Sequence, residues 1–549
     1  MKKLCSLILA AASICLWSCA GASSSGSTAA SGEWDSSSEE LVVKTESGLI
    51  AGYRDGNTYI YKGVPYAQAE RFMPPTQVEA WEGVRSCRAY GPTAPQAVRT
   101  GWQSDEAAFA FAWNDGFPGE NCQRLNIWTT SLGDSKKRPV MVWLHGGGYS
   151  AGSGQELPSY DGRHLAQKDV VVVSLNHRLN VLGFLDLSAF GEKYAKSGNV
   201  GMLDIVAALR WVKNNIANFG GDPDNVTIFG QSGGGGKVST LMSMPDAKGL
   251  FHKAIVQSGS TLTTMTSEWS RRIGVAILDE LHLSASQIDS LATVPYERLL
   301  AAGAAAVEKV KKENASATSL LFGWSPTVDG VVLPRHPFSP DAPEQSRDIP
   351  MLIGTTFTEF AASAYVPQMR NLPEDKVMEM VRQNYGDSTE KFVEAYQKAY
   401  PSYKPADLID TDFMFRAQAI TQARLKAQQG GAPVWMYLFG WQSPVLNGAL
   451  RSTHCMEIPF VFNNADVHAS MTGGGADALK LANRMSDAWV NFARCGNPNG
   501  EKGIEGVPAW EPFTAQDGNT MWWDNDCKIL KNHDREVIEI ATSKLKTKI

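Results

Sequence analysis

Short runs of apolar residues recur along the chain, and segments with the spacing of amphipathic helices lie between several of them. Apolar residues from Leu203 to Phe219, for example, follow the i, i+3, i+4, i+7 spacing of a helix, which Gly220 to Pro223 ends. Apolar runs that alternate with helices predict a largely parallel sheet with helices on both faces. The runs expected to form strands are Pro139–Leu144, Val170–Leu175, Val226–Phe229, Lys253–Val256, Pro350–Ile353 and Val434–Phe439.

The region from residue 41 to residue 549 is predicted to be one large α/β domain. The length of the whole chain, 549 residues, would alone suggest about three to four domains. However, no internal repeat and no Pro/Ser-rich linker divides the chain after residue 40. Two stretches of mostly helical composition, Glu268–Ala317 and Glu374–Gln429, are expected to be helical insertions into the sheet.

Composition narrows the possible partners. Hydrophobic residues make up 43% of the chain and charged residues 20%, as in a folded globular protein. Lys and Arg number 51 against 57 Asp and Glu, a net charge of −6. Because nucleic-acid binding needs a basic face, no nucleic-acid partner is expected.

The N-terminus has the pattern of an export signal. Lys2 and Lys3 precede an apolar stretch, Leu4–Trp17, that is too short to span about 30 Å of hydrocarbon as a helix. Residues 1–18 are therefore predicted to be a signal peptide of the lipoprotein type, because residues 16–19 resemble a bacterial lipobox in which Cys19 is lipidated. A flexible Ser/Gly-rich tether is expected over residues 19–40.

This pattern predicts an exported bacterial lipoprotein, periplasmic or on the cell surface, that touches the membrane only through its lipid anchor. Ordinary cleavage after Ala20 or Ala22 is the alternative, and it would give a secreted protein. Five cysteines follow the tether, and an oxidising compartment would allow some to pair. Cys87 and Cys122 are the nearest pair before the glycine-rich motifs, while the states of Cys455, Cys495 and Cys527 stay open.

A serine nucleophile is the first chemical prediction. The strand-like run from Val226 leads into Gly230-Gln231-Ser232-Gly233-Gly234, a G-x-S-x-G motif. In such a motif the serine stands on a sharp strand-to-helix turn, where flanking glycines avoid collisions with neighbouring chain. A phosphate-binding loop is disfavoured because the glycines lack the Lys-Ser/Thr of that motif in the required spacing.

A glycine-rich loop is expected to supply hydrogen-bond donors to the same centre. The strand-like run Pro139–Leu144 ends in His145-Gly146-Gly147-Gly148. Adjacent glycines let backbone N–H groups point at a developing oxyanion. Gly147, Gly148 and Gly233 are the expected donors, and His145 is expected to be structural.

Together these motifs make the chain similar to type-B carboxylesterases, the α/β-hydrolase family that includes cholinesterases and bacterial para-nitrobenzyl esterases. The similarity covers about residues 41–530. It rests on Phe72–Pro75, Glu120–Trp128, His145–Gly148, Asn176–Arg178, Gly198–Asp204, Phe219–Pro223, Gly230–Gly234 and Asn491–Asn499. Gln231 and Gly233 depart from the Glu and Ala usual in the family.

A serine needs an imidazole oriented by a carboxylate, and in this fold the order along the chain is Ser, acid, His. His454 lies beyond the strand-like Val434–Phe439 and matches the family motif H-x-x-E-[IL]-P. Glu359 follows the strand-like Pro350–Ile353 and matches G-T-x-x-x-E. Asp329, before Gly330, is the competing acid and is expected to be a turn residue instead.

The resemblance implies hydrolysis of small-molecule carboxylic esters to acid and alcohol, with no cofactor and no metal. It also implies a Cys87–Cys122 disulfide and salt bridges Arg71–Glu120 and Arg178–Asp204. Trp269 and Tyr149 are expected to line the substrate pocket. A catalytically silent binding or adhesion protein of the same fold is the alternative, disfavoured because Ser232, Glu359 and His454 are all present.

Overall fold

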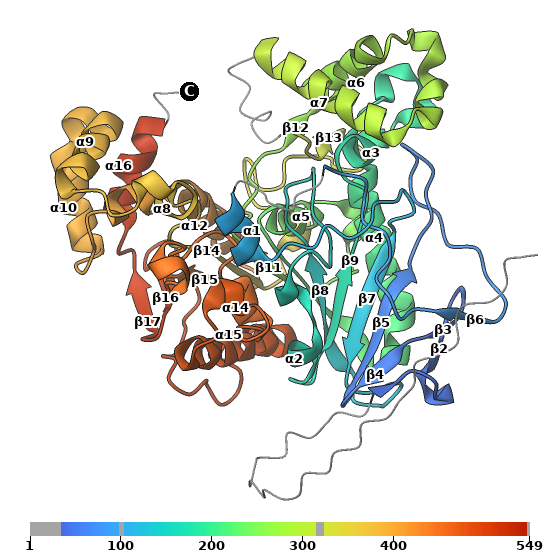
Figure 1. Cartoon of the computed structure of the whole chain (residues 1–549), viewed down its shortest axis with the longest axis horizontal. Helices are drawn as coiled ribbons and strands as arrows, with labels where there is room; N and C mark the ends of the chain where they lie inside the picture. The colour runs from blue at the N-terminus through green and yellow to red at the C-terminus, as the bar shows by residue number, and fades with distance from the viewer. Residues whose placement is uncertain (1–33, 98–103, 314–322, 546–549) are drawn as a thin grey trace, which may run out of the picture.

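A computed structural model describes residues 34–97, 104–313 and 323–545 (Figure 1). The predicted signal peptide, Cys19 and most of the tether lie outside these residues. The core of the fold is a twelve-stranded sheet. In spatial order its strands are β1 (Trp34–Asp35), β4 (Tyr53–Asp55), β5 (Thr58–Pro65), β7 (Arg124–Thr129), β9 (Val171–Leu175), β8 (Arg138–Leu144), β10 (Gly221–Gln231), β11 (Lys253–Gln257), β14 (Met351–Thr356), β15 (Val434–Phe439), β16 (Asn519–Trp523) and β17 (Lys528–Lys531).

The strands from β9 to β16 run parallel, and antiparallel strands flank them at both edges. The predicted mostly parallel sheet with helical insertions is therefore confirmed. All six apolar runs expected to form strands coincide with strands of this parallel part, although the runs from Val170 and Pro350 each begin one residue before the strand does. Smaller strands form two further sheets: β2 (Val42–Thr45), β3 (Gly48–Ala51), β6 (Val84–Ser86), and β12 (Met265–Thr266) with β13 (Thr327–Val328).

The two faces of the sheet bury separate apolar cores. In β8, Val140 and Val142 face one core while Met141 and Trp143 face the other, which is the two-residue period of a strand. The first core includes side chains of α4 (Val200–Asn215), α5 (Gly233–Leu241) and α12 (Met414–Gln428). The second includes side chains of α2 (Arg163–Ala166), α13 (Ile458–Val461) and α15 (Ala476–Cys495).

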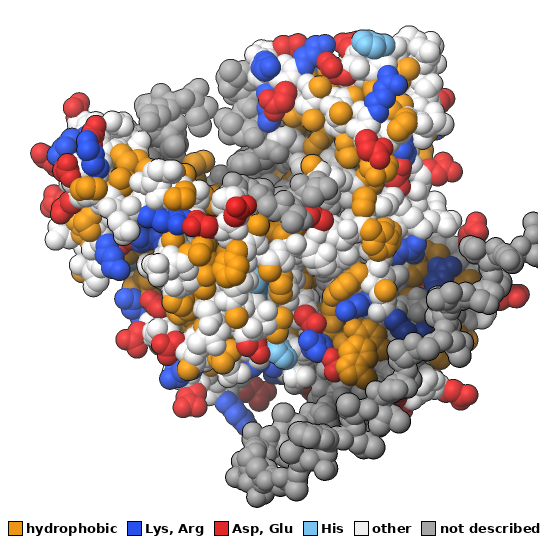
Figure 2. Space-filling view, in the orientation of Figure 1, with side chains coloured by type: hydrophobic (Ala, Val, Ile, Leu, Met, Phe, Trp, Pro, Cys, Tyr) orange, Lys and Arg blue, Asp and Glu red, His pale blue; other side chains and the backbone are white. Residues whose placement is uncertain are grey.

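Two groups of helices stand apart from the sheet, on either side of α5 in Figure 1. One contains α6 (Ser267–Leu281) and α7 (Tyr296–Glu313). The other contains α9 (Glu374–Tyr385), α10 (Thr389–Ala399) and α16 (Arg535–Leu545), which share an apolar cluster of their own. Both groups show charged side chains on their outer surfaces in Figure 2. The short helices are α1 (Asp105–Phe111), α3 (Asn180–Phe184), α8 (Ala362–Tyr365), α11 (Asp407–Asp410) and α14 (Ala469–Thr472).

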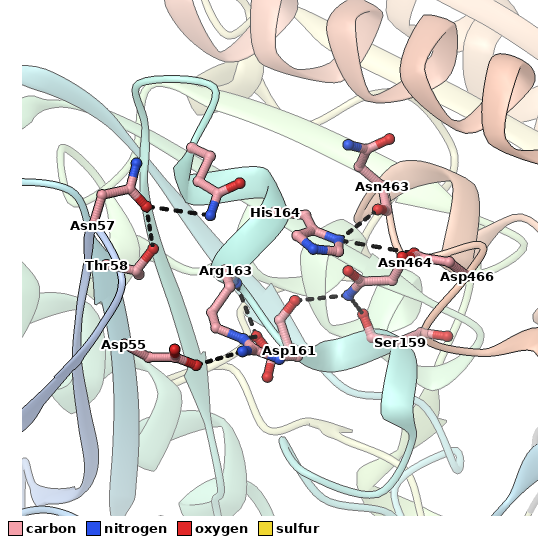
Figure 3. Close-up of polar contacts among 11 residues, drawn as sticks. Asp55, Asn57, Thr58, Ser159, Asp161, Arg163, His164, Asn463, Asn464 and Asp466 are labelled. Atoms are coloured by element: carbon pink, nitrogen blue, oxygen red, sulfur yellow. Dashed lines mark hydrogen bonds and ion pairs between the residues drawn. The ribbon is translucent and has the colours of Figure 1, made fainter. Parts of the chain in front are cut away.

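A polar network ties together segments that are far apart in sequence (Figure 3). Arg163, at the start of α2, donates to Asp55 on β4 and to Asp161. Asn464 donates from its amide group to the backbone oxygens of Ser159 and Asp161, at 2.8 and 2.7 Å. The network joins the edge of the sheet to the loop that follows α13.

Both implied salt bridges are present. Arg71 lies 2.5 Å from Glu120, and Arg178 lies 2.7 Å from Asp204 in a pair that is almost fully buried. The implied Cys87–Cys122 disulfide is not formed. Both residues are free thiols, and both are buried. The two side chains pack in separate apolar clusters: Cys87 in the large core, and Cys122 beside Ala94 and Leu179.

Two features of the described residues bear on membrane and metal partners. None of the helices in residues 34–97, 104–313 and 323–545 has both the length and the apolar character needed to cross a membrane. Within the same ranges, no group of three or more His, Cys, Asp or Glu side chains is arranged to hold a metal ion.

Candidate active site

The sequence motifs meet at the end of the sheet formed by the carboxyl ends of its parallel strands. The loop after β8, the turn after β10, the segment after β14 and the longer loop after β15 all leave the carboxyl ends of parallel strands. Leu144, the last residue of β8, pairs with Gly230 on β10, so the glycine-rich loop and the G-x-S-x-G turn are neighbours. In parallel α/β sheets this end is where ligands bind.

Ser232 occupies a strained turn between β10 and α5. Its backbone angles are φ 57° and ψ −125°, which a residue with a Cβ adopts only at a cost. Gly230 and Gly234 make the turn possible, because a Cβ at either position would lie 2.5 or 1.9 Å from the carbonyl oxygen of Leu144. The serine thus stands at the amino end of α5, where the helix dipole is positive.

Three backbone N–H groups beside this serine have no acceptor among the described residues: those of Gly147, Gly148 and Gly233. Gly147 and Gly148 have φ of 77° and 62°, so the loop uses the left-handed conformation that glycine tolerates. A Cβ on Gly147 would lie 2.3 Å from the carbonyl oxygen of Ala151. Unpaired donors next to a nucleophile are the requirement for binding an oxyanion.

Glu359 and His454 form a buried pair. The Glu359 carboxylate lies 2.5 Å from Nδ1 of His454, and it also accepts the Thr356 N–H at 2.9 Å. Backbone contacts hold the two segments together, because the His454 N–H donates to the Glu359 carbonyl at 2.6 Å. Asp329 instead accepts three N–H groups, those of Val331, Val332 and Leu333, as a turn residue does.

The Ser232 hydroxyl forms no hydrogen bond to His454 within the described part of the chain. Gln231 lies between the two segments, with its amide nitrogen 3.3 Å from both ring nitrogens of His454. Catalytic hydrogen bonds in free enzymes are often longer than in the substrate complex. A proton transfer from Ser232 to His454 would require the two side chains to approach one another.

Two further carboxyl groups surround the pair. Burial raises the pKa of Glu457 to about 7, and the negative charge of Glu359 adds to the shift. The same two causes raise the pKa of Asp412 to about 7, against the lowering effect of N–H groups at the start of α12. Near neutral pH the site can thus hold Glu359 beside two partly protonated carboxyl groups.

Aromatic residues that the sequence reasoning missed cover the imidazole. Phe360 stacks on His454 with ring centroids 4.5 Å apart and planes at 30°, and Phe415 lies 5.6 Å from the same ring. Phe360 nevertheless keeps 48% of its surface exposed. Its position directly after Glu359 was the available signal, because a residue next to the acid has to lie close to the base.

The two predicted pocket residues lie in different places. Tyr149 follows the glycine loop and packs on α5, where its hydroxyl is 3.5 Å from Oγ1 of Thr240. Trp269 lies in the first turn of α6, with the guanidinium carbon of Arg272 4.8 Å from its ring centroid. Among the described residues, no hydrogen bond or ring contact joins Trp269 to Ser232 or His454, so its place in a pocket stays a prediction.

Comparisons with known proteins agree with this arrangement. The sequence profile of the carboxylesterase family matches residues 39–539. The para-nitrobenzyl esterase of Bacillus subtilis (strain 168) is 37% identical over 510 residues, 90% of this chain and 97% of that protein. The phenmedipham hydrolase of Pseudarthrobacter oxydans is 33% identical over 87% of this chain and 93% of that protein.

Solved structures agree as well. An esterase from Clostridium hathewayi, described as able to hydrolyse aliphatic aromatic polyesters, superimposes with a TM-score of 0.83. It is 38% identical, and the alignment covers 92% of this chain and 98% of that one. A thermophilic para-nitrobenzyl esterase superimposes with a TM-score of 0.73 at 33% identity, covering 91% of this chain and 100% of the other.

Proposed function

The chain belongs to the carboxylesterase family and is a carboxylic ester hydrolase, and on this premise we propose that it works through an acyl-enzyme on Ser232. The observation that carries the proposal is the strained Ser232 backbone beside three unpaired N–H groups, at the same end of the sheet as the Glu359–His454 pair. The named relatives are esterases, and none of them favours a silent binding protein.

Each residue has one role in the proposed reaction. His454 takes the Ser232 proton as the oxygen attacks the ester carbonyl, and Glu359 holds the imidazole and stabilises its charged form. The N–H groups of Gly147, Gly148 and Gly233 bind the oxyanion of the tetrahedral intermediate. The imidazolium then protonates the departing alcohol, and water activated by the same base releases the acid.

The test is Ser232→Ala, assayed with short-chain para-nitrophenyl esters and a serine-directed organophosphate. Turnover and labelling should both disappear while the melting temperature stays within a few degrees. Ser243→Ala is the matched control, because this buried serine follows the far end of α5 and its hydroxyl has no hydrogen-bond partner in the part of the chain that the structure describes. Full activity in Ser232→Ala would refute the mechanism.

We further propose that the esters carry an aromatic group next to the scissile bond. Phe360 and Phe415 lie 5.7 Å apart and form an apolar surface beside His454. Met414, which precedes Phe415 in the chain, is 47% exposed as well. Two relatives support this class: one is named for para-nitrobenzyl esters, and the other is described as able to hydrolyse aliphatic aromatic polyesters.

We also propose that the protein is exported and anchored by lipid on Cys19. The apolar Leu4–Trp17 segment and the Ser/Gly-rich residues that follow it support this proposal. Cys19→Ala should move the esterase from the membrane fraction to the soluble fraction and abolish labelling by a fatty-acid probe. Exposed Cys495 supplies the control, because Cys495→Ala should change neither result. Membrane retention and labelling of Cys19→Ala would overturn the anchor.

A further inference from the structure

Lys237 is a fully buried lysine in α5, little more than one turn beyond Ser232. Its ammonium group donates to the carbonyl oxygens of His145 at 2.8 Å and Gly148 at 3.0 Å. Lysines are rarely buried without a carboxylate partner. No carboxylate of the described residues lies within ion-pair distance of Lys237, and burial lowers its pKa to about 7.

The two carbonyl groups belong to the oxyanion loop, which we define as His145–Gly148. One lies at each end of the loop, so a single ammonium group bridges the whole segment that carries the Gly147 and Gly148 donors. Both glycines have positive φ, and nothing in a glycine side chain can hold such a loop in place. A loop of this kind needs an external contact to stay in one conformation.

Gly233 provides the space for this close approach. A Cβ on Gly233 would lie 2.3 Å from the carbonyl oxygen of Gly148 and 2.5 Å from its Cα and N. The family usually has alanine at this position. The oxyanion loop therefore packs on α5 more closely than an alanine at position 233 would allow.

Other polar groups around Lys237 do not replace its charge. His145 and His177 stack with ring centroids 5.0 Å apart, and burial together with the Lys237 charge lowers the pKa of both rings well below the usual value. Glu156 attracts the ammonium group from a longer distance but accepts hydrogen bonds from Ser153 and Tyr160. The Tyr149 ring lies 5.5 Å from Nζ.

We propose that Lys237 is a positioning residue that clamps the oxyanion loop to α5, with Gly233 supplying the room for the clamp. The inference rests on the proposed function, in which the glycine N–H groups bind the oxyanion. Its consequence is specific to the transition state, because the donors have to fit the tetrahedral oxyanion and not the ground-state ester. A loosened loop should therefore lower kcat and leave KM nearly unchanged.

The test compares Lys237→Met with Lys426→Met. Lys426 is also fully buried and donates to a backbone carbonyl, that of Arg347 at 2.8 Å, but it has no contact with the oxyanion loop. We expect Lys237→Met to lower kcat at least 10-fold with KM within twofold. The affinity for a trifluoromethyl ketone, which mimics the tetrahedral intermediate, should fall by the same factor. Lys426→Met should keep wild-type values of all three.

A second variant tests the clamp with Lys237 in place. Gly233→Ala should push the loop from α5 and lower kcat with little change in KM, and adding Lys237→Met should cost less than the product of the two single effects. Wild-type kcat and wild-type analogue affinity in Lys237→Met would overturn the clamp. If Lys237→Met does not fold, wild-type kcat in Gly233→Ala would overturn it instead. A negative result for the clamp would not contradict the Ser232 mechanism. Full activity in Ser232→Ala would contradict that mechanism, and the clamp with it.

Discussion

Replacing Glu359 by glutamine isolates the charge of the proposed acid. The glutamine has nearly the same shape, and the contacts of the Glu359 carbonyl with His454 and Thr453 come from the backbone. The Thr356 N–H can still donate to the side-chain oxygen. We therefore expect the Glu359→Gln protein to fold with a melting temperature close to that of the wild type.

The cost should appear in catalysis. When His454 becomes positively charged, the buried carboxylate 2.5 Å from its Nδ1 stabilises that charge. Two unit charges about 4 Å apart in an effective dielectric of about 20 interact by about 4 kcal/mol. At about 1.4 kcal/mol per factor of ten, that is roughly a 1,000-fold fall in kcat.

The assay is kcat for para-nitrophenyl butyrate at pH 8, with stopped-flow measurement of the acylation burst. Glu457→Gln is the matched control, because Glu457 is also fully buried near the pair, but its carboxylate accepts from the Gln257 amide at 3.2 Å and forms no hydrogen bond to His454 among the described residues. We expect the control to lose less than tenfold. A kcat of Glu359→Gln within tenfold of wild type would refute the assignment of the charge, as would a larger loss in the control.

Four further outcomes are expected. Burial raises the folded-state pKa of Glu457 from 4.5 to about 7, so the ionised carboxyl destabilises the folded protein. This destabilisation is absent below pH 4.5 and complete above pH 7. Glu457→Gln should therefore raise the melting temperature at pH 8 and not at pH 4. Equal shifts at both pH values would contradict this. Phe360→Ala should lower kcat/KM about 3- to 10-fold for benzyl esters and less for ethyl esters, with Val366→Ala as the exposed control; equal losses would argue against the aromatic subsite. Gly147→Ala should lower kcat about 100-fold or more, because its Cβ would meet the Ala151 carbonyl; unchanged kcat would remove Gly147 from the oxyanion hole. Burial raises the pKa of Cys87 to about 11 and of Cys122 to about 12, so both should react with Ellman's reagent only after denaturation, without reductant; a titre that needs reductant would indicate a disulfide.

The central strands were predictable because they are buried on both faces and leave an uninterrupted apolar run. The edge strands were not. β17, for example, begins and ends in lysine, and it is recognisable as a strand only through its pairing with β16. β10 begins at Gly221 rather than Val226, because Gly221 pairs with Arg138 across an irregularity in the register.

Some residues of the site could likewise be predicted from the sequence and others could not. Ser232 and the glycine loop are local motifs whose conformation follows from a few neighbouring residues, and the sequence indicates them directly. Lys237 follows four glycines and could be a surface residue by composition. Its burial depends on a loop 92 residues away in sequence, which a local pattern does not reveal. The disulfide was expected from family resemblance, and only packing shows the two cysteines in separate clusters.

The order in which the chain supplies its active site has a consequence for biogenesis. The oxyanion loop and the proposed nucleophile, acid and base follow β8, β10, β14 and β15 in turn, and β15 pairs on its far side with β16, at residues 519–523. The chain must therefore be synthesised through about residue 523 before the segment that carries the proposed base can dock in place. On the proposed mechanism, a chain that ends before residue 519 would lack this pairing, and the appearance of esterase activity would report the addition of β16, the last parallel strand.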